Sequence, residues 1–272
     1  MINTPSMVKS TRVVQVGGVR IGGKELVVIA GPCSIESEAQ FLQAGKTAKS
    51  GGAHLLRGGI YKLRTHPQSF QGLGEAALGI ARSVREQIGL PLVSEVTDPR
   101  QIEPLLETID VFQVGTRNMF NYPLLKELGK ISKPVILKRS FSATIEEWLL
   151  SAEYIESEGN QNIILCERGI RTFEPATRNT LDLAAVAYVK RHSSLPILVD
   201  PSHGTGRREL VEPMSLAAIA AGADGLLIEV HPNAEASLSD GHQSIDGDAF
   251  ISLMAKVERI GKAVDRPMMR FM

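Results

Sequence analysis

Four side chains in this sequence are of types that bind a divalent transition metal. They are one thiol, one imidazole and two carboxylates, at Cys33, His203, Glu229 and Asp240. Soft sulfur combined with nitrogen and oxygen suits a borderline ion such as Mn²⁺, Fe²⁺, Co²⁺ or Zn²⁺. Their spacing is not that of a local zinc motif, so a metal site exists only if the fold brings the four together.

A second group of side chains is cationic. Arginine donates two parallel hydrogen bonds to a phosphate or carboxylate, whereas lysine acts as a point charge. The chain has 30 basic and 30 acidic residues, which argues against a general nucleic-acid or membrane surface and favours a local polyanion site. The cations are Arg57, Lys62, Arg64, Arg117, Lys138, Arg139 and Arg168. Of these, Arg139 is expected to be structural, paired with a neighbouring carboxylate.

The elements that must position these residues follow from the apolar pattern. Short apolar runs alternate with longer amphipathic stretches, which indicates parallel strands covered by helices. Eight such units in 272 residues favour an α/β fold, a closed (β/α)₈ TIM barrel, as a single domain over residues 1–272. The predicted strands are Glu25–Ala30, Ala53–Arg57, Leu92–Glu95, Val111–Val114, Pro134–Lys138, Asn162–Cys166, Pro196–Asp200 and Gly225–Val230. The predicted helices are Ser37–Ser50, Glu75–Gly89, Pro99–Ile109, Tyr122–Leu128, Thr144–Glu158, Ala176–His192, Glu209–Ala221 and Gly247–Ala263.

The N-terminal extension, residues 1–24, is predicted to contain a short β-hairpin. Two glycines separate the apolar runs of Val13–Gly18 and Val19–Gly23, as in a tight turn between two strands. The extension has no apolar stretch of signal-peptide type, and no run approaches the ~20 residues that span a bilayer. The chain has two cysteines, too few for a disulfide framework, so a reducing, cytoplasmic location is expected. Cys166 is expected to be a reduced core residue.

Barrel enzymes carry their chemistry at the C-terminal ends of the strands, and nearly every predicted strand here ends in a charged or reactive residue. The first, seventh and eighth strands become neighbours when the sheet closes. Cys33 and His203 follow the first and seventh strands, Glu229 lies near the end of the eighth, and Asp240 lies in the loop after it. Closure of the barrel therefore predicts that the four candidate metal ligands meet.

Six ordered motifs occupy the predicted strand ends and their loops. They are Ile29–Ser37, Lys62–Thr65, Gly115–Asn118, Leu137–Arg139, Asp200–Gly206 and Ile228–Pro232. Together they resemble the 3-deoxy-D-arabino-heptulosonate 7-phosphate (DAHP) synthases, in the short barrel form that is related to the octulosonate 8-phosphate synthases. The resemblance extends from about Val27 to Asp246. It departs from the family at Leu63, where proline is usual, and at His242, where proline is frequent.

The resemblance implies a metal-dependent transferase that opens the shikimate pathway by condensing phosphoenolpyruvate with erythrose 4-phosphate. It implies assembly into dimers or tetramers. It also implies roles for matching positions, with Lys138 and the ligands Cys33 and His203 serving catalysis. The implied metal ligands are Cys33, His203, Glu229 and Asp240. The residues implied to hold phosphoenolpyruvate are Arg117, Lys138 and Arg168, with Lys62 close by. Those implied to receive erythrose 4-phosphate are Arg57, Arg64 and Thr65.

Three alternatives stay open at this point. The aldehyde substrate could be arabinose 5-phosphate, as in the octulosonate enzymes. Lys138 could instead form an imine, as in a Schiff-base aldolase. A non-catalytic phosphate-sensing barrel is a third possibility, although sensing needs no cluster of Cys, His, Glu and Asp. Since one barrel accounts for the whole sequence, we expect no feedback inhibition by aromatic amino acids.

Overall fold

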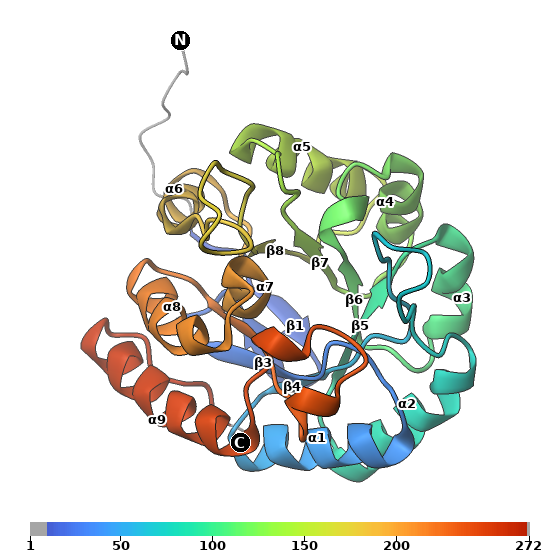
Figure 1. Cartoon of the computed structure of the whole chain (residues 1–272). Coiled ribbons are helices and arrows are strands. Elements are labelled where there is room, and N and C mark those ends of the chain that lie inside the picture. Colours follow the sequence, from blue (N-terminus) through green and yellow to red (C-terminus); the bar gives the residue numbers. More distant parts are fainter. Residues whose placement is uncertain (1–9, 271–272) are drawn as a thin grey trace.

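A closed barrel of eight parallel strands forms the centre of the computed structural model, which describes residues 10–270 (Figure 1). The strand order is β10-β3-β4-β5-β6-β7-β8-β9. The predicted barrel is thus confirmed, and β3 pairs with β10, which pairs with β9. The strands are β3 Val27–Gly31, β4 Leu55–Arg57, β5 Leu92–Val96, β6 Val111–Val114, β7 Val135–Lys138, β8 Ile163–Glu167, β9 Ile197–Val199 and β10 Gly225–Glu229.

Helices surround the barrel and connect successive strands (Figure 1). Local sequence signals set their starts: Thr144 and Glu147 form a capping box at α5, and the Ser37 side chain caps α1. In residues 10–270, no helix combines the length and apolar character needed to cross a membrane. The α-helices are α1 Glu38–Ser50, α2 Ala76–Ile88, α3 Ile102–Leu105, α4 Tyr122–Gly129, α5 Ile145–Glu156, α6 Leu183–His192, α7 Pro201–Thr205, α8 Arg208–Ala220 and α9 Gly247–Ala263. The 3₁₀ helices are η1 Pro99–Gln101, η2 Thr116–Asn118, η3 Ala234–Ala236 and η4 Gly241–Gln243.

One predicted helix begins later than expected, and one short helix was missed. The helix expected from Ala176 begins only at Leu183, where the Asp182 side chain accepts a hydrogen bond from the Ala185 amide and caps α6. The residues before it form a loop, closed by an antiparallel bridge between Ile170 and Thr180. The short helix α7, directly after β9, was not expected. It was overlooked because five residues are too few to show an amphipathic period.

Side chains alternate between two apolar layers along each strand. In β3, Val27 and Ile29 belong to a cluster that takes residues from all eight barrel strands, whereas Val28 and Ala30 pack in the cluster shared with the helices. The first cluster fills the barrel interior, as expected for a small barrel. Because the side-chain period of a strand is two, the residue two positions after an interior residue also points inward. At the end of a strand, that side chain lies at the C-terminal mouth of the barrel. Among the candidate site residues, Arg57, Lys138, Arg168 and Glu229 occupy such positions.

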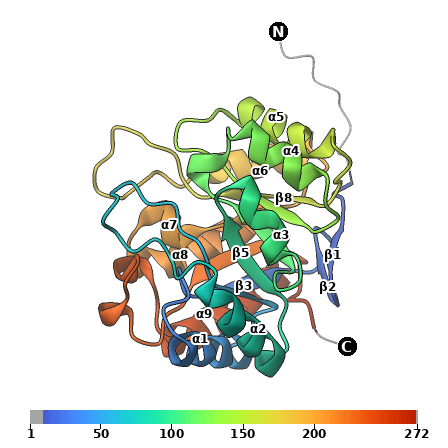
Figure 2. The same cartoon turned by 90° about the vertical axis from the view of Figure 1, so that its right-hand side faces the viewer.

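The predicted hairpin is confirmed and lies at the other end of the barrel (Figure 2). Strands β1 Val14–Val16 and β2 Val19–Ile21 pair antiparallel across the turn at Gly17, where φ is 56°. The apolar side chains of both strands are buried in the interior cluster. The hairpin thereby seals the N-terminal end, and the loops at the opposite end remain available for chemistry.

Truncation of Ile21 to alanine is expected to lower the free energy of unfolding by about 2–5 kcal/mol, since it removes a fully buried side chain below the barrel. Urea denaturation measures this, with Val13→Ala as the control because Val13 is 48% exposed. Equal losses in the two variants would show that the hairpin does not contribute to the core.

Candidate active site

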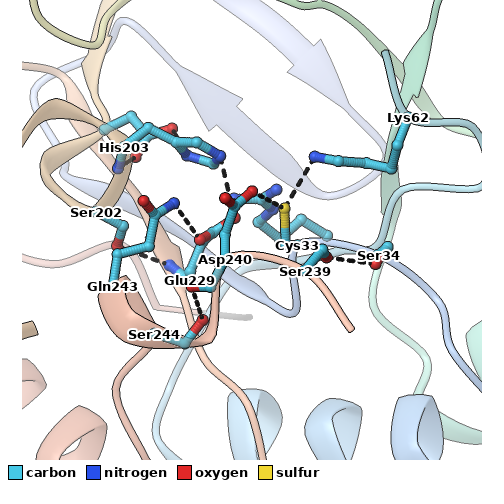
Figure 3. Close-up of polar contacts among 12 residues, drawn as sticks. Cys33, Ser34, Lys62, Ser202, His203, Glu229, Ser239, Asp240, Gln243 and Ser244 are labelled. Atoms are coloured by element: carbon cyan, nitrogen blue, oxygen red, sulfur yellow. Dashed lines mark hydrogen bonds and ion pairs between the residues drawn. The ribbon is translucent and has the colours of Figure 1, made fainter. Parts of the chain in front are cut away.

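The four predicted metal ligands converge at the C-terminal mouth of the barrel (Figure 3). One ligand atom from each of Cys33, His203, Glu229 and Asp240 lies within 4.8 Å of the others. Cys33 Sγ is 3.2 Å from Asp240 Oδ2, and His203 Nε2 is 3.2 Å from Glu229 Oε1. Four donors of the types that transition metals prefer thus surround one point.

Each of these side chains is placed by a specific piece of backbone. Gly31 ends β3 with φ of 147°, and a Cβ there would lie 2.2 Å from the Arg57 carbonyl oxygen. Only glycine therefore fits at position 31, where the chain turns toward Cys33. Asp240 has φ of 55°, a left-handed conformation that aspartate tolerates better than most residues. Its loop is tied to the loop of Cys33 by a 2.7 Å hydrogen bond between Ser34 and Ser239 (Figure 3).

The electrostatics of the cluster suit a cation. Burial raises the pKa of the Cys33 thiol, and the Glu229 carboxylate raises it further, so the thiolate needs positive charge nearby. Lys62 Nζ lies 2.9 Å from Cys33 Sγ. Glu229 Oε1 is buried and accepts no hydrogen bond from residues 10–270. A buried carboxylate oxygen that has an ion pair with Arg57 but no hydrogen bond from the described residues, and that lies beside a thiol and an imidazole, fits a transition-metal ion.

Asp200 orients the imidazole of this cluster and was not among the predicted site residues. Its Oδ2 lies 2.7 Å from His203 Nδ1 and accepts a 2.6 Å hydrogen bond from Lys138 Nζ. Burial lowers the pKa of His203 to about 4, so the ring is neutral at pH 7. Donation from Nδ1 to Asp200 leaves the Nε2 lone pair free to bind a metal. The position of Asp200 at a strand end, three residues before His203, is the sequence feature that could have identified it as a site residue.

Replacing Asp200 by asparagine is expected to weaken metal binding about tenfold, because the amide no longer stabilises both Lys138 and the correct His203 tautomer. Isothermal titration of the metal-free protein with Mn²⁺ measures the dissociation constant. Asp224→Asn is the matched control: Asp224 is also fully buried and pairs with Lys190 and Arg266, but before β10, at the opposite end. An unchanged dissociation constant for Mn²⁺ in Asp200→Asn would show that Asp200 does not orient His203 for metal binding.

A cationic cavity of about 230 Å³ opens beside the cluster. Arg117 Nη2 donates a 2.8 Å hydrogen bond to Thr65 Oγ1, which fixes the loop after β4 against the β6 loop. Glu95 and Gln113 add polar atoms from β5 and β6. The cationic side chains that line the cavity are Lys62, Arg64, Arg117, Lys138, Arg168 and Arg178.

Arg168 is the most buried arginine in this lining, with 3% of its surface exposed. Burial lowers the pKa of its guanidinium to about 10, which still leaves it charged at pH 7. Its Nη1 atom is buried and has no hydrogen-bond partner in the described chain. A buried cation with an unused donor that lines a cavity is suited to an anionic ligand.

Two cations, Arg57 and Arg178, lie differently from the sequence expectation, whereas Arg139 agrees with it. Arg57 does not line the main cavity; its Nη1 is 3.2 Å from Glu229 Oε1, on the metal-ligand side. Arg139 is structural, as expected, because its side chain contacts Glu167 at 3.0 Å and Asp182 at 2.9 Å. Arg178 lines the cavity but escaped prediction, since it fell within the helix wrongly expected from Ala176.

Cys166 is confirmed as a buried free thiol within the barrel interior. It belongs to β8, and burial raises the pKa of its thiol.

Comparisons with known proteins agree with this architecture. The chain is 49% identical over 252 residues to the phospho-2-dehydro-3-deoxyheptonate aldolase of Thermotoga maritima, covering 93% of this chain and 75% of the relative. It is 32% identical over 276 residues to the 2-dehydro-3-deoxyphosphooctonate aldolase of Geobacter sulfurreducens, covering 93% and 99%.

Solved structures give the same relationship. The crystal structure of the Thermotoga maritima heptonate aldolase (DAHP synthase) superposes with a TM-score of 0.92 at 48% identity, covering 96% of this chain and 76% of that one. A truncated form of the Thermotoga maritima enzyme has a TM-score of 0.89 at 45% identity and is covered over 95% of its length. The model of the DAHP synthetase I family matches residues 6–266. The chain therefore belongs to the DAHP synthetase I family.

Proposed function

We propose that this protein condenses phosphoenolpyruvate with erythrose 4-phosphate and water, giving DAHP and inorganic phosphate. The observation that carries the proposal is the convergence of four metal-ligand side chains beside a cavity lined by six cations. The two substrates together bring two phosphates and a carboxylate, which match that excess of positive charge. Membership of the family and the 49% identity to a heptonate aldolase support the same reaction.

The cations would hold two mutually repelling anions close together, which replaces the entropy of their encounter with binding energy. We assign phosphoenolpyruvate to Arg117, Lys138 and Arg168, with Lys62 close by. The phosphate of the aldose is assigned to Arg64 and Thr65. Arg57, which pairs with Glu229, then acts on the metal-ligand side and not as a direct contact to the aldose phosphate.

The metal is proposed to be held by Cys33, His203, Glu229 and Asp240, and a bound divalent ion would polarise the aldehyde oxygen or lower the pKa of water. Thiolate and imidazole ligands favour Mn²⁺, Fe²⁺, Co²⁺ or Zn²⁺. The enzyme is further proposed to act as a dimer or tetramer.

In the proposed reaction, carbon 3 of phosphoenolpyruvate forms a bond to the aldehyde carbon, and the aldehyde oxygen takes up a proton. Water adds to carbon 2, and the resulting hemiketal expels inorganic phosphate. Lys138 is the proposed proton donor, since its Nζ is buried within the lining and bonded to Asp200. Asp200 keeps that ammonium oriented and holds His203 through Nδ1.

The contact with Asp200 argues against the Schiff-base alternative. An amine must be free to attack a carbonyl, whereas Lys138 Nζ is held in a 2.6 Å contact with Asp200 Oδ2. Borohydride reduction in the presence of substrate would trap an imine at Lys138, and its mass would be found on that peptide. We expect no such adduct.

The test of the proposed function is an assay with phosphoenolpyruvate and each of two aldehydes, erythrose 4-phosphate and arabinose 5-phosphate. Phosphate release and the mass of the sugar acid product are both measured. The expected outcome is a seven-carbon product with erythrose 4-phosphate. An eight-carbon product made faster than the seven-carbon one would assign the octulosonate reaction instead, and no phosphate release with either aldehyde would refute the proposal.

A further inference from the structure

One aromatic ring at the barrel mouth is surrounded by arginines. The guanidinium carbons of Arg168 and Arg171 each lie 4.8 Å from the centre of the Phe141 ring, and that of Arg117 lies 5.5 Å from it. All three distances are within the range of a cation–π contact. The three arginines come from different segments: Arg117 follows β6, whereas Arg168 and Arg171 follow β8.

The backbone fixes this ring relative to the arginines. The amide of Arg171 donates a 2.8 Å hydrogen bond to the Phe141 carbonyl oxygen, which joins the loop after β7 to the loop after β8. Glu167, fully buried, accepts hydrogen bonds from Arg139 on the first loop and from the Gly169 amide on the second. The two loops therefore form one unit with the ring between them.

The ring contacts the arginines without occupying their N–H groups; Arg117 uses two of its own for hydrogen bonds to Thr65 Oγ1 and the Leu63 carbonyl oxygen. Within residues 10–270, Arg117, Arg168 and Arg171 make no salt bridge, and no side-chain hydrogen bond is found for Arg168 or Arg171. A carboxylate at this position would also gather the arginines, but it would neutralise their charge and occupy their N–H groups. An aromatic face attracts cations through its quadrupole and accepts no strong hydrogen bond.

Such a partner is useful because Arg117 and Arg168 lie close to other positive charges, among them Arg178. Burial first, and then the neighbouring cations Arg178 and Arg64, lower the pKa of Arg117. Arg117 and Arg168 line the cavity, whereas Phe141 is outside the set of described residues that line it. The ring thus contacts the arginines without touching the space that a ligand would fill.

We propose that Phe141 is a positioning residue, which helps to hold Arg117 and Arg168 by cation–π contact without occupying their N–H groups. Arg168 Nη1, and the Arg117 donors that are not bonded to Thr65 and Leu63, then remain for the phosphate of phosphoenolpyruvate. The inference rests on the proposed function. Arg171 completes the cluster on the same ring and adds positive charge near the cavity.

The test compares Phe141→Leu, which keeps apolar bulk, with Phe141→Tyr, which keeps the ring. We expect KM for phosphoenolpyruvate to rise about tenfold in Phe141→Leu, while KM for the aldose and kcat change by less than about threefold. Phe141→Tyr should restore the parent KM. Calorimetric titration with inorganic phosphate should show a similar weakening of phosphate binding in Phe141→Leu. A general structural defect would also raise KM for the aldose.

Phe173→Leu is the matched control, since Phe173 lies in the neighbouring β8–α6 loop, two residues after Arg171, but is 99% exposed. It should leave every parameter unchanged. The inference is overturned if Phe141→Leu binds phosphoenolpyruvate and phosphate like the parent. It is also overturned if both KM values rise equally and tyrosine fails to rescue them. A parent enzyme that does not condense the two substrates would refute the proposed function itself, a result distinct from either of these.

Discussion

Exhaustive chelation is expected to abolish condensation, and Mn²⁺ or a similar transition ion should restore it. The reason is the burial of the ligand cluster: three of its four members, Cys33, His203 and Glu229, are buried, and Glu229 Oε1 has no hydrogen bond from the described residues. Without a cation, the aldehyde oxygen has no Lewis acid to stabilise the charge that develops on it, a contribution of several kcal/mol. The rate of phosphate release is measured before chelation, after it and after addition of each metal.

Full turnover by protein that contains no metal, by elemental analysis, would falsify this prediction. A second experiment tests the contribution of the Cys33 thiol to metal binding. Cys33→Ser should weaken binding of softer ions such as Zn²⁺ and Co²⁺ more than binding of Mn²⁺, because a hydroxyl is a much poorer soft ligand than a thiolate. The matched control is Cys166→Ser, at the other buried free cysteine, inside the barrel. Any loss of metal affinity there would point to an indirect effect of packing.

The architecture was predictable because barrel strands are buried on both faces, so their apolar runs stand out from the helices between them. The alternation within each strand also explains which charged side chains point into the C-terminal end of the barrel. Leu55 and Ile136 are interior residues, and Arg57 and Lys138 follow each of them by two positions. Arg139 has the opposite parity and packs against Glu167, which agrees with its expected structural role.

What the sequence could not supply were contacts that depend on loops. Arg178 was missed because the pattern from Ala176 onward resembles a helix, whereas that helix, capped by Asp182, begins seven residues later than expected, at Leu183. Asp200 was noticed only as a charged strand end. Its link to both Lys138 and His203 depends on α7, whose single turn has no recognisable period. The Arg57–Glu229 pair likewise required the distance between the ends of β4 and β10, two strands that β3 separates.

Preference for erythrose 4-phosphate over arabinose 5-phosphate is the second large effect that we expect. It depends on Arg64 and Thr65, in the loop after β4. Arg64 Nη1 is buried without a hydrogen-bond partner in the described chain and lies 3.8 Å from Asp240 Oδ2. Thr65 Oγ1 is fixed by its hydrogen bond from Arg117. These donors are therefore held at a set distance from the metal-ligand cluster, where the aldehyde is proposed to react.

A five-carbon aldose places its phosphate one C–C bond, about 1.5 Å, farther from the aldehyde. Each buried polar group that loses its partner costs roughly 1–3 kcal/mol, so two misplaced contacts predict a preference of about 30-fold or more in kcat/KM. For the same reason, Arg64→Ala is expected to lower kcat/KM for erythrose 4-phosphate by roughly 100-fold, because a charge-assisted contact to phosphate is lost.

The measurement is kcat/KM for both aldoses in the parent enzyme, in Arg64→Ala and in Arg20→Ala. Arg20 is an appropriate control because it is an exposed arginine on the hairpin at the opposite end of the barrel, paired with Glu25. Its variant should retain the parent values and the parent preference. KM for phosphoenolpyruvate should stay close to that of the parent in Arg64→Ala, since that substrate is assigned to other cations. Equal kcat/KM for the two aldoses in the parent, or unchanged erythrose 4-phosphate kinetics in Arg64→Ala, would show that this loop covers the cavity without selecting the sugar.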